Sequence, residues 1–441
     1  MKQIGLLFSF IIGIPIWLGS FVQGQSIETQ LTDLSKKYHF TFKSLETDTT
    51  RFTKKFILYI EQPVDHYRPD GKKFIQRIIL SHKTFNKPVV LVTEGYSAAY
   101  AERKGYQHEL SKYLDANQIV VEHRYFNQSV PDTLDWDYLT VFNAASDHHH
   151  VVEILKNLYS GKWVNTGISK GGQTAVYHRY FYPEDVDATV GYVCPFNFSK
   201  ADRRSYVFLD TVGSKKCREN IFRFQKELLK NKEKYLPHFK KLAEKKGLTY
   251  RMGIEKGFEL TTFEFAFAFW QWGQYSCDSI PLAKNSSPKE MIKYLDQVAG
   301  LNWIADQGIE GAMQPFFIQA MKELGMYGYH VEPFKEWTTY QKDVSFDFTI
   351  PKGVELHYSP ELMQQVDYFI RHKAHNLILI YGGTDAWSFA AGEPTLHTNA
   401  FRVIKPGGSH HTRIRNLPEH QRKQVLDSLS RWLQTPINLA Q

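Results

Sequence analysis

One six-residue segment, Gly-Ile-Ser-Lys-Gly-Gly at positions 167–172, constrains the fold of this chain more than any other feature. It follows the strand-like residues 162–165 and precedes the helix-like residues 173–179. Glycines two positions before and after the serine allow a tight strand-to-helix turn. Such a turn exposes the serine hydroxyl above the end of a sheet, next to a helix N-terminus that favours negative charge. Ser169 is therefore predicted to be a nucleophile, and an ordinary glycine-rich turn is the alternative.

Two residues far downstream suit this serine. Residues 376–381 read as a buried strand that runs into Gly-Gly-Thr-Asp, so Asp385 follows a strand end. Residues 400–404 read as another strand, which runs into Pro-Gly-Gly-Ser-His, so His410 follows a second strand end. Because polar groups after parallel strands gather at one edge of a sheet, the order serine, acid, histidine predicts a catalytic triad. His411 is an alternative base, but the Gly-Gly-x-His spacing favours His410.

Length and charge exclude some classes of function. The 441 residues allow one large domain with an insertion, or two domains. Lys and Arg number 54 against 46 Asp and Glu, and the net charge of +8 is mild for this length. The densest basic run, residues 226–246, alternates with Glu, Leu and Phe, as on the solvated faces of amphipathic helices. We therefore expect no nucleic-acid partner.

The N-terminus carries an apolar stretch over residues 4–22 that ends in small residues. This pattern predicts a signal peptide over residues 1–24, with cleavage near Gly24, and a secreted or periplasmic protein. A membrane anchor is the alternative, since the stretch is nearly long enough to span a bilayer. No other apolar stretch has that length, so we expect no stable membrane insertion after cleavage.

Cysteine and histidine patterns do not indicate a metal site. Three cysteines leave one unpaired: Cys194 is predicted to be a buried thiol, while Cys217 and Cys277 could pair. The run of three histidines at 148–150 reads as the start of a helix that follows the capping residues 146–147. Consecutive helical residues point in different directions, so these histidines cannot face one ion. We expect neither a metal nor a cofactor.

The order of expected elements indicates an α/β architecture with an insertion. In residues 25–200, a loosely helical stretch over 25–50 precedes an antiparallel hairpin over 51–62 and 74–82, buried strands at 89–93 and 119–121, and a helix over 151–158. Strand signals are absent from residues 201–345, where helical periodicity covers 219–246, 263–273, 288–298 and 313–325. The sheet is expected to resume near Pro351, within residues 346–441. This predicts a mostly parallel sheet with an antiparallel edge and a helical cap over 201–345.

Several motifs together carry a family resemblance. They are Val-Val-Glu-His-Arg-Tyr-Phe at 120–126, Thr-Glu-Gly-Tyr at 93–96, the segment around Ser169, and similar segments at 62–66, 180–188, 385–387 and 406–410. The chain resembles the secreted bacterial tripeptidyl (prolyl tri/tetrapeptidyl) aminopeptidases, which are α/β-hydrolase serine peptidases related to prolyl carboxypeptidase and dipeptidyl peptidase II. The resemblance implies an α/β-hydrolase fold with a large helical cap between the nucleophile and the acid. The chain departs from the family in having Asn127 where glycine is usual and Ala386 where proline is usual.

The same resemblance assigns roles at the site. Ser169 is expected to be the nucleophile, His410 the base and Asp385 the acid that orients it. The backbone N–H of Lys170 is the first expected oxyanion donor, and that of Gly95 or Tyr96 is the second.

An aminopeptidase also needs acceptors for a free ammonium, and the resemblance points to the cap for them. Glu323 is the first candidate, with a surface glutamate on a helix as the alternative. Glu94 either braces its loop or meets the substrate amine. Trp270, Gln271 and Trp387 are candidates for the substrate pocket, or else packing residues.

The expected function is a serine exopeptidase that removes short peptides, tripeptides above all, from free N-termini, with a possible preference for proline. Its partners would be peptide substrates. A prolyl carboxypeptidase-like enzyme is one alternative and would need a cation for the substrate carboxylate. A carboxylesterase is another and would share the triad without a charged acceptor in the cap. The sequence leaves the oligomeric state open.

Overall fold

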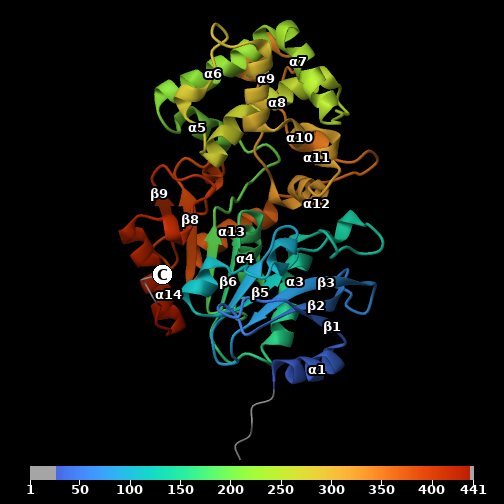
Figure 1. The fold of residues 1–441 in the computed structure, drawn as a ribbon, viewed down its shortest axis with the longest axis vertical. Helices are drawn as coiled ribbons and strands as arrows, with labels where there is room; N and C mark the ends of the chain where they lie inside the picture. Colours follow the sequence, from blue (N-terminus) through green and yellow to red (C-terminus); the bar gives the residue numbers. More distant parts are fainter. Residues whose placement is uncertain (1–25, 438–441) are drawn as a thin grey trace, which may run out of the picture.

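The computed structural model describes residues 26–437, so the predicted signal peptide over residues 1–24 lies outside the described residues. Its centre is a nine-stranded sheet with the strand order β1-β2-β3-β5-β4-β6-β7-β8-β9 (Figure 1). The strands are β1 Thr41–Leu45, β2 Lys54–Pro63, β3 Lys73–His82, β4 Val89–Thr93, β5 Asn117–Val121, β6 Trp163–Ile168, β7 Ala188–Tyr192, β8 Leu377–Gly382 and β9 Phe401–Lys405.

The sheet is antiparallel at one end and parallel through the rest. Strands β1, β2, β3 and β5 pair antiparallel, which confirms the predicted hairpin of β2 and β3. From β5 through β4, β6, β7 and β8 to β9 every pairing is parallel. The carboxyl ends of β6, β8 and β9 therefore meet at one edge, and the segments that follow them carry Ser169, Asp385 and His410. Strand β1 was not expected, because its mostly exposed residues give no burial signal.

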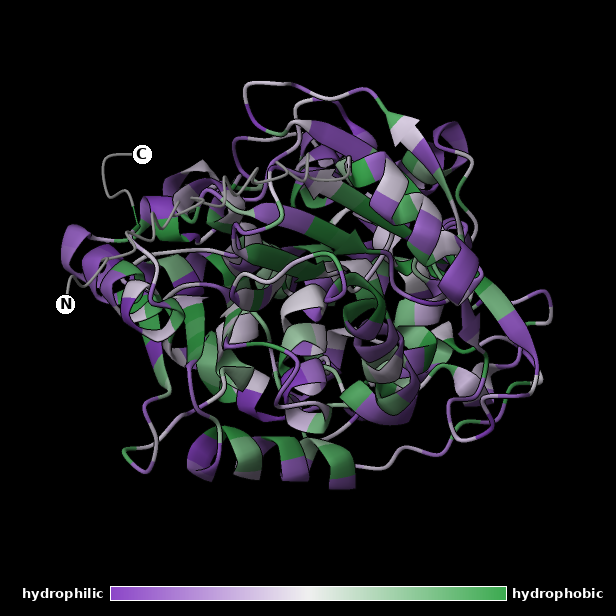
Figure 2. Cartoon of the chain, turned by 90° about the horizontal axis from the view of Figure 1, so that it is seen from below, coloured by the Kyte–Doolittle hydropathy of each residue, from purple (hydrophilic) through white to green (hydrophobic). Residues whose placement is uncertain are grey.

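Helices cover both faces of the sheet because the strand residues alternate between two apolar clusters. Val90 and Val92 pack on the face that α2 and α14 cover, whereas Val89 and Leu91 pack on the opposite face with α1 and α3. In Figure 2 the central strands are mostly green, and the surrounding helices alternate green and purple. The helices outside the cap are α1 Ile27–Tyr38, α2 Glu109–Tyr113, α3 Val141–Leu155, α4 Lys170–Phe181, α13 Glu361–His372 and α14 Glu419–Leu433.

A helical layer lies between β7 and β8 in the sequence and above the sheet in space (Figure 1). Its long helix α8 is buried on nearly all sides, since Phe263, Phe265, Phe267 and Phe269 all belong to one aromatic-rich cluster. The helices of this layer are α5 Arg204–Thr211, α6 Lys215–Lys230, α7 Lys232–Lys245, α8 Ile254–Trp272, α9 Pro288–Ala299, α10 Leu301–Ile304, α11 Asp306–Ile309 and α12 Gln314–Gln319. A disulfide joins Cys217 and Cys277 within it, and Cys194, which follows β7, is free and buried.

The predicted start of the helix that carries the three histidines is wrong. Helix α3 begins at Val141, where the Thr140 side chain accepts from the Asn143 N–H at 3.1 Å. Ser146 and Asp147 lie inside the helix rather than at its cap. Asp147 does not cap the helix; its side chain forms a buried ion pair with Arg124 from the middle of α3.

Two other boundaries also differ from expectation. The helical stretch predicted over 219–246 is two helices, α6 and α7, which meet at Asn231. The sheet resumes at Leu377 and not near Pro351, because residues 361–372 form α13.

Candidate active site

Ser169 occupies a strained turn between β6 and α4. Its φ of 56° and ψ of −124° lie in a region that non-glycine residues rarely adopt. The Ser169 N–H donates to the Tyr192 carbonyl at 2.8 Å, which fixes the turn to the end of β7. A Cβ at Gly167 would lie 2.2 Å from the carbonyl carbon of Gly171, so only glycine fits at position 167. The close packing at Gly167 therefore fixes the backbone of the turn that carries Ser169.

Asp385 and His410 form a buried pair. The His410 Nδ1 lies 2.7 Å from Asp385 Oδ2, with 0% of Asp385 and 6% of His410 exposed. The Trp387 N–H donates to the other oxygen, Oδ1, at 3.1 Å. With Nδ1 as the donor to the carboxylate, Nε2 of His410 is left to accept a proton.

His410 is also tied to the cap. The His410 N–H donates to the carbonyl of Gln271, in the last turn of α8, at 2.8 Å. His411 by contrast is exposed, and its ring packs 5.5 Å from that of Trp272. In residues 26–437 Asp385 forms a side-chain bond with His410 and none with His411. This geometry favours His410 as the base.

A small cavity of about 20 Å³ borders both Ser169 and the loop after β8 that carries Asp385 and Trp387. Its lining includes Ser169, Tyr96 and Trp387, the last of which also binds Asp385 through its N–H. The Ser169 hydroxyl has no hydrogen-bond partner within the part of the chain that the structure describes. Catalytic hydrogen bonds of a free enzyme commonly tighten only when substrate is bound.

The loop after β4 touches the serine turn. A Cβ on Gly95 would lie 2.6 Å from both the Gly171 nitrogen and the Lys170 Cβ, so the two backbones are in direct contact. The Lys170 Nζ donates to the Gly95 carbonyl at 2.8 Å. The N–H of a trans peptide points opposite to its carbonyl, so this bond sets the direction of the Tyr96 N–H. Over residues 26–437 the Tyr96 N–H has no acceptor, whereas its carbonyl accepts from the His123 N–H at 3.1 Å.

The side chain of Lys170 is buried beneath the turn. Its Nζ lies 3.1 Å from His123 Nε2 and faces the rings of Phe126 and Tyr96 at 5.1 and 5.6 Å. Burial lowers the pKa of Lys170 well below its usual value. Glu94 nearby accepts from the Tyr100 hydroxyl, and burial raises the pKa of its carboxyl to about 7. That bond favours a role for Glu94 in bracing its loop.

Sequence reasoning gave no role to Glu122 and Arg124, although both belong to the motif that carried the resemblance. Glu122 is fully buried and accepts from the Ala98 N–H at 2.9 Å and from Arg77 at 3.1 Å. Arg124 is also fully buried and forms a two-pronged ion pair with Asp147, with both N–O distances at 2.7 Å. Together they fix the loops that follow β4 and β5. The signal for them was a run of charged residues directly after a buried strand.

The backbone is left-handed at Asn127, where the family usually has glycine. Asn127 has a φ of 51°, which glycine adopts freely and asparagine tolerates. Its side-chain nitrogen also donates to Glu122 at 3.0 Å, a bond that glycine could not make.

The remaining predicted substrate residues lie in different places. The Glu323 carboxylate accepts from the Val141 N–H at 2.8 Å and so caps α3, and burial raises its pKa to about 7. Gln271 reaches His410 through its backbone carbonyl. Trp387 lines the cavity beside Ser169, whereas Trp270 lines a separate cavity in the cap. Glu323 is not among the lining residues of either cavity.

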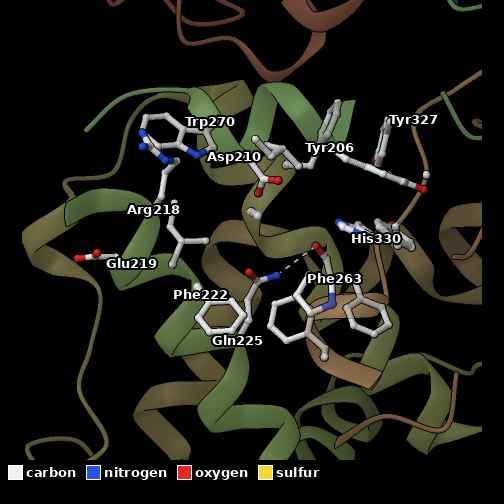
Figure 3. Close-up of a pocket in the computed structure, with 18 of the residues that line it drawn as sticks. Tyr206, Asp210, Arg218, Glu219, Phe222, Gln225, Phe263, Trp270, Tyr327 and His330 are labelled. Atoms are coloured by element: carbon white, nitrogen blue, oxygen red, sulfur yellow. Dashed lines mark hydrogen bonds between the residues drawn. The ribbon is translucent and has the colours of Figure 1, made fainter. Parts of the chain in front are cut away.

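The cap cavity is much larger, about 530 Å³, and its walls come from α5, α6, α8 and the segment 327–334 (Figure 3). Phe267 and Tyr327 in its wall stack with ring centroids 3.6 Å apart. Each of these rings also meets the Trp387 ring edge-on, with centroids 5.1 Å apart. One aromatic layer therefore separates the cap cavity from the cavity at Ser169.

Residues 26–437 contain neither a cluster of metal-binding side chains nor a membrane-spanning helix. No group of three or more His, Cys, Asp or Glu side chains there could hold a metal ion. Within that same range, every helix is too short or too polar to cross a bilayer.

A sheet of this topology, with a strained serine after β6 and a buried His–Asp pair after β8 and β9, defines the α/β-hydrolase class. Residues 42–436 match the family model described as PS-10 peptidase S37. The chain belongs to this family and is a serine peptidase.

Two of the similar proteins are peptidases whose names refer to proline. The chain is 31% identical over 386 residues to the prolyl tri/tetrapeptidyl aminopeptidase of Streptomyces mobaraensis, covering 85% of this chain and 79% of that protein. It is 27% identical over 147 residues, 30% of each chain, to the lysosomal Pro-X carboxypeptidase of Mus musculus. Among solved structures, the proline iminopeptidase of Mycobacterium smegmatis aligns over 85% of this chain and 99% of its own with a TM-score of 0.39 and 13% identity.

Proposed function

We propose that this serine peptidase is a secreted aminopeptidase that removes tripeptides from the free N-termini of peptides, with a preference for proline at the cleaved bond. The observation that carries the proposal is the buried His410–Asp385 pair, at 2.7 Å, on the same sheet edge as the strained Ser169. The name of the Streptomyces relative supports the choice of the N-terminal end and of proline.

The mechanism follows from the placement of these groups. Asp385 holds His410 so that Nε2 takes the Ser169 proton as the hydroxyl oxygen attacks the scissile carbonyl. The N–H groups of Lys170 and Tyr96 receive the oxyanion. His410 then protonates the leaving amine, and the acyl-enzyme on Ser169 is hydrolysed by a water molecule that His410 activates.

Secretion is part of the proposal and has two supports. The apolar N-terminal stretch with small residues near Gly24 reads as a signal peptide. The disulfide between Cys217 and Cys277 is typical of proteins that mature in an oxidising compartment.

The test compares the two ends of one substrate. A proline-containing hexapeptide is offered with a free or acetylated N-terminus and with a free or amidated C-terminus, and the products are identified by mass spectrometry. We expect acetylation to lower kcat/KM by about tenfold to several hundredfold, because a buried ammonium interaction is lost. Amidation should have little effect, and Ser169→Ala should remove all turnover. If amidation lowers kcat/KM and acetylation does not, the carboxypeptidase hypothesis is supported instead. If neither modification lowers kcat/KM, the protein is an endopeptidase or an esterase.

A further inference from the structure

One carboxyl group of the cap is buried without a counter-ion. Glu264, on α8, is 4% exposed. The hydroxyls of Tyr327 and Tyr329 both donate to its Oε2 at 2.8 Å. Its other oxygen, Oε1, has no hydrogen-bond partner in residues 26–437, and no Lys or Arg there pairs with it.

Several other buried carboxyl groups of this chain have a basic partner. Glu122 pairs with Arg77, Asp147 with Arg124, Glu259 with Lys232 and Asp385 with His410. A buried carboxylate without a cation is unfavourable, and burial accordingly raises the pKa of Glu264 to about 8. Such a group is suited to bind a cation that comes from outside the chain.

Helix α8 gives the spacing between Glu264 and the residue that binds the backbone of His410. The carbonyl of Gln271 accepts from His410, and one turn earlier the Phe267 ring contacts Trp387 at 5.1 Å. Glu264 lies a further turn earlier, and positions 264, 267 and 271 share one face of a helix. Seven residues at about 1.5 Å each place Glu264 roughly 10 Å along the axis from the contact with His410.

That distance matches a tripeptide. Three extended residues span about 10 Å, which is the reach from a scissile carbonyl to the α-ammonium of the third residue before it. Tyr327 and Tyr329 line the cap cavity of about 530 Å³, whereas Glu264, to which their hydroxyls donate, is not itself part of the lining of that cavity. Aromatic faces around a carboxyl favour a cation further.

We propose that Glu264, together with the hydroxyls of Tyr327 and Tyr329, binds the α-ammonium group of the substrate, and that its distance from His410 along α8 selects tripeptides. This inference rests on the proposed function, because it assigns the group that reads the free N-terminus. On this proposal the peptide passes the aromatic layer of Phe267, Tyr327 and Trp387, which lies between the two cavities.

The two other acidic candidates fit this role less well. The Glu323 carboxylate accepts from the Val141 N–H at the start of α3, so it is bound to a helix outside the cap rather than to residues that line the cap cavity. Glu94 directly precedes Gly95 and Tyr96, so it lies beside the oxyanion donors and is too close to the reacting carbonyl for the far end of a tripeptide.

The test uses Glu264→Gln, which keeps the shape of the side chain but cannot ionise when an ammonium group binds. The full-length protein is assayed with Ala-Ala-Pro-p-nitroanilide, with its N-acetyl derivative, and with p-nitrophenyl acetate, which needs the triad alone. We expect kcat/KM for the free-amine substrate to fall by about tenfold to a hundredfold, mainly through KM. Turnover of the acetylated peptide and of the ester should stay within about twofold, so that the preference for a free amine disappears.

Two further measurements sharpen the result. Glu323→Gln is the matched control, since it neutralises another buried carboxyl of the cap, and it should keep the preference for a free amine. Substrates with two, three and four residues before the nitroanilide test the distance. The wild-type protein should favour three, and Glu264→Gln should flatten that preference.

The outcomes separate the inference from the proposed function. If the wild-type protein shows no preference for a free amine, both fail. If it shows the preference and Glu264→Gln retains it, or Glu323→Gln loses it instead, the inference alone is overturned. Should Glu264→Gln fail to fold, as judged by loss of ester turnover, Tyr329→Phe provides the same test with a severalfold loss expected, and an unchanged preference in that variant overturns the inference.

Discussion

Replacing Gly95 by alanine should disable the oxyanion site while leaving the triad intact. The added Cβ would lie 2.6 Å from the Gly171 nitrogen and from the Lys170 Cβ, and 2.7 Å from the Lys170 carbonyl carbon. Ordinary contacts between such atoms begin near 3.5 Å, so the loop after β4 and the serine turn must separate by about 1 Å. Two of these three atoms are backbone, and no flexible side-chain end can move aside.

The separation has a catalytic and a structural consequence. It moves the Tyr96 N–H away from the oxyanion, and the loss of one such donor lowers kcat by about 10²- to 10³-fold. It also overpacks a buried contact, which destabilises a protein by about 1–3 kcal/mol. KM for a tripeptide substrate should change little, because the Cβ is not in the cap.

Steady-state kinetics on Ala-Ala-Pro-p-nitroanilide and thermal unfolding measure these two effects. Gly105→Ala is the control, since a Cβ there would meet only the end of the Arg51 side chain, at 3.9 Å. The control should match the wild-type protein in both measurements. A Gly95→Ala variant with kcat within about threefold of wild type would show that Tyr96 does not supply an oxyanion donor.

Three further predictions concern the base, the disulfide and the buried carboxyl. His410→Ala should lose activity by several orders of magnitude and His411→Ala by much less, as measured by turnover of the same substrate, since only His410 bonds to Asp385. Reduction of the Cys217–Cys277 disulfide, which closes a loop of 60 residues, should destabilise the cap by about 4 kcal/mol and lower its unfolding temperature, and an unchanged temperature would contradict this. Burial raises the pKa of Glu264 from 4.5 to about 8, so the folded protein loses stability as the pH rises between these values. Glu264→Gln does not titrate, and its free energy of unfolding relative to the wild-type protein should therefore increase by up to roughly 5 kcal/mol from pH 4.5 to pH 8. Denaturant unfolding at both pH values measures this difference.

The serine turn, the acid and the histidine were accessible from the sequence because each follows a strand by a fixed, short, glycine-rich segment. Local patterns of that kind survive folding, since a strand end and its turn are set by neighbours in the chain. The order along the chain then places all three at one edge of a parallel sheet. The long-range contact that ties Gln271 to His410 leaves no such local trace.

The role of Glu323 as a substrate residue stays a prediction, but its contacts show what the sequence does not reveal. Glu323 follows α12 in a π-helical turn, Ala320–Leu324, that aims its carboxylate at the start of α3, some 180 residues earlier in the chain. Glu264 was passed over because it stands between Phe263 and Phe265 in a stretch that reads as core. Whether a glutamate among phenylalanines is paired or free depends on side chains that are distant in the sequence, such as Tyr327 and Tyr329.

Helix α8 links both ends of the proposed substrate to one rigid element. Its last turn holds the backbone of His410, and its middle carries Glu264, so about two helical turns lie between the base and the ammonium site. A rigid helix changes this distance only in steps of whole residues, because each inserted residue also rotates the carboxylate by about 100°. A peptidase of this fold could therefore release a different length of peptide only by placing its acidic residue a full turn nearer or farther along the helix. The number of residues released is, on this reasoning, set by the spacing between positions 264 and 271 rather than by the volume of the cap cavity.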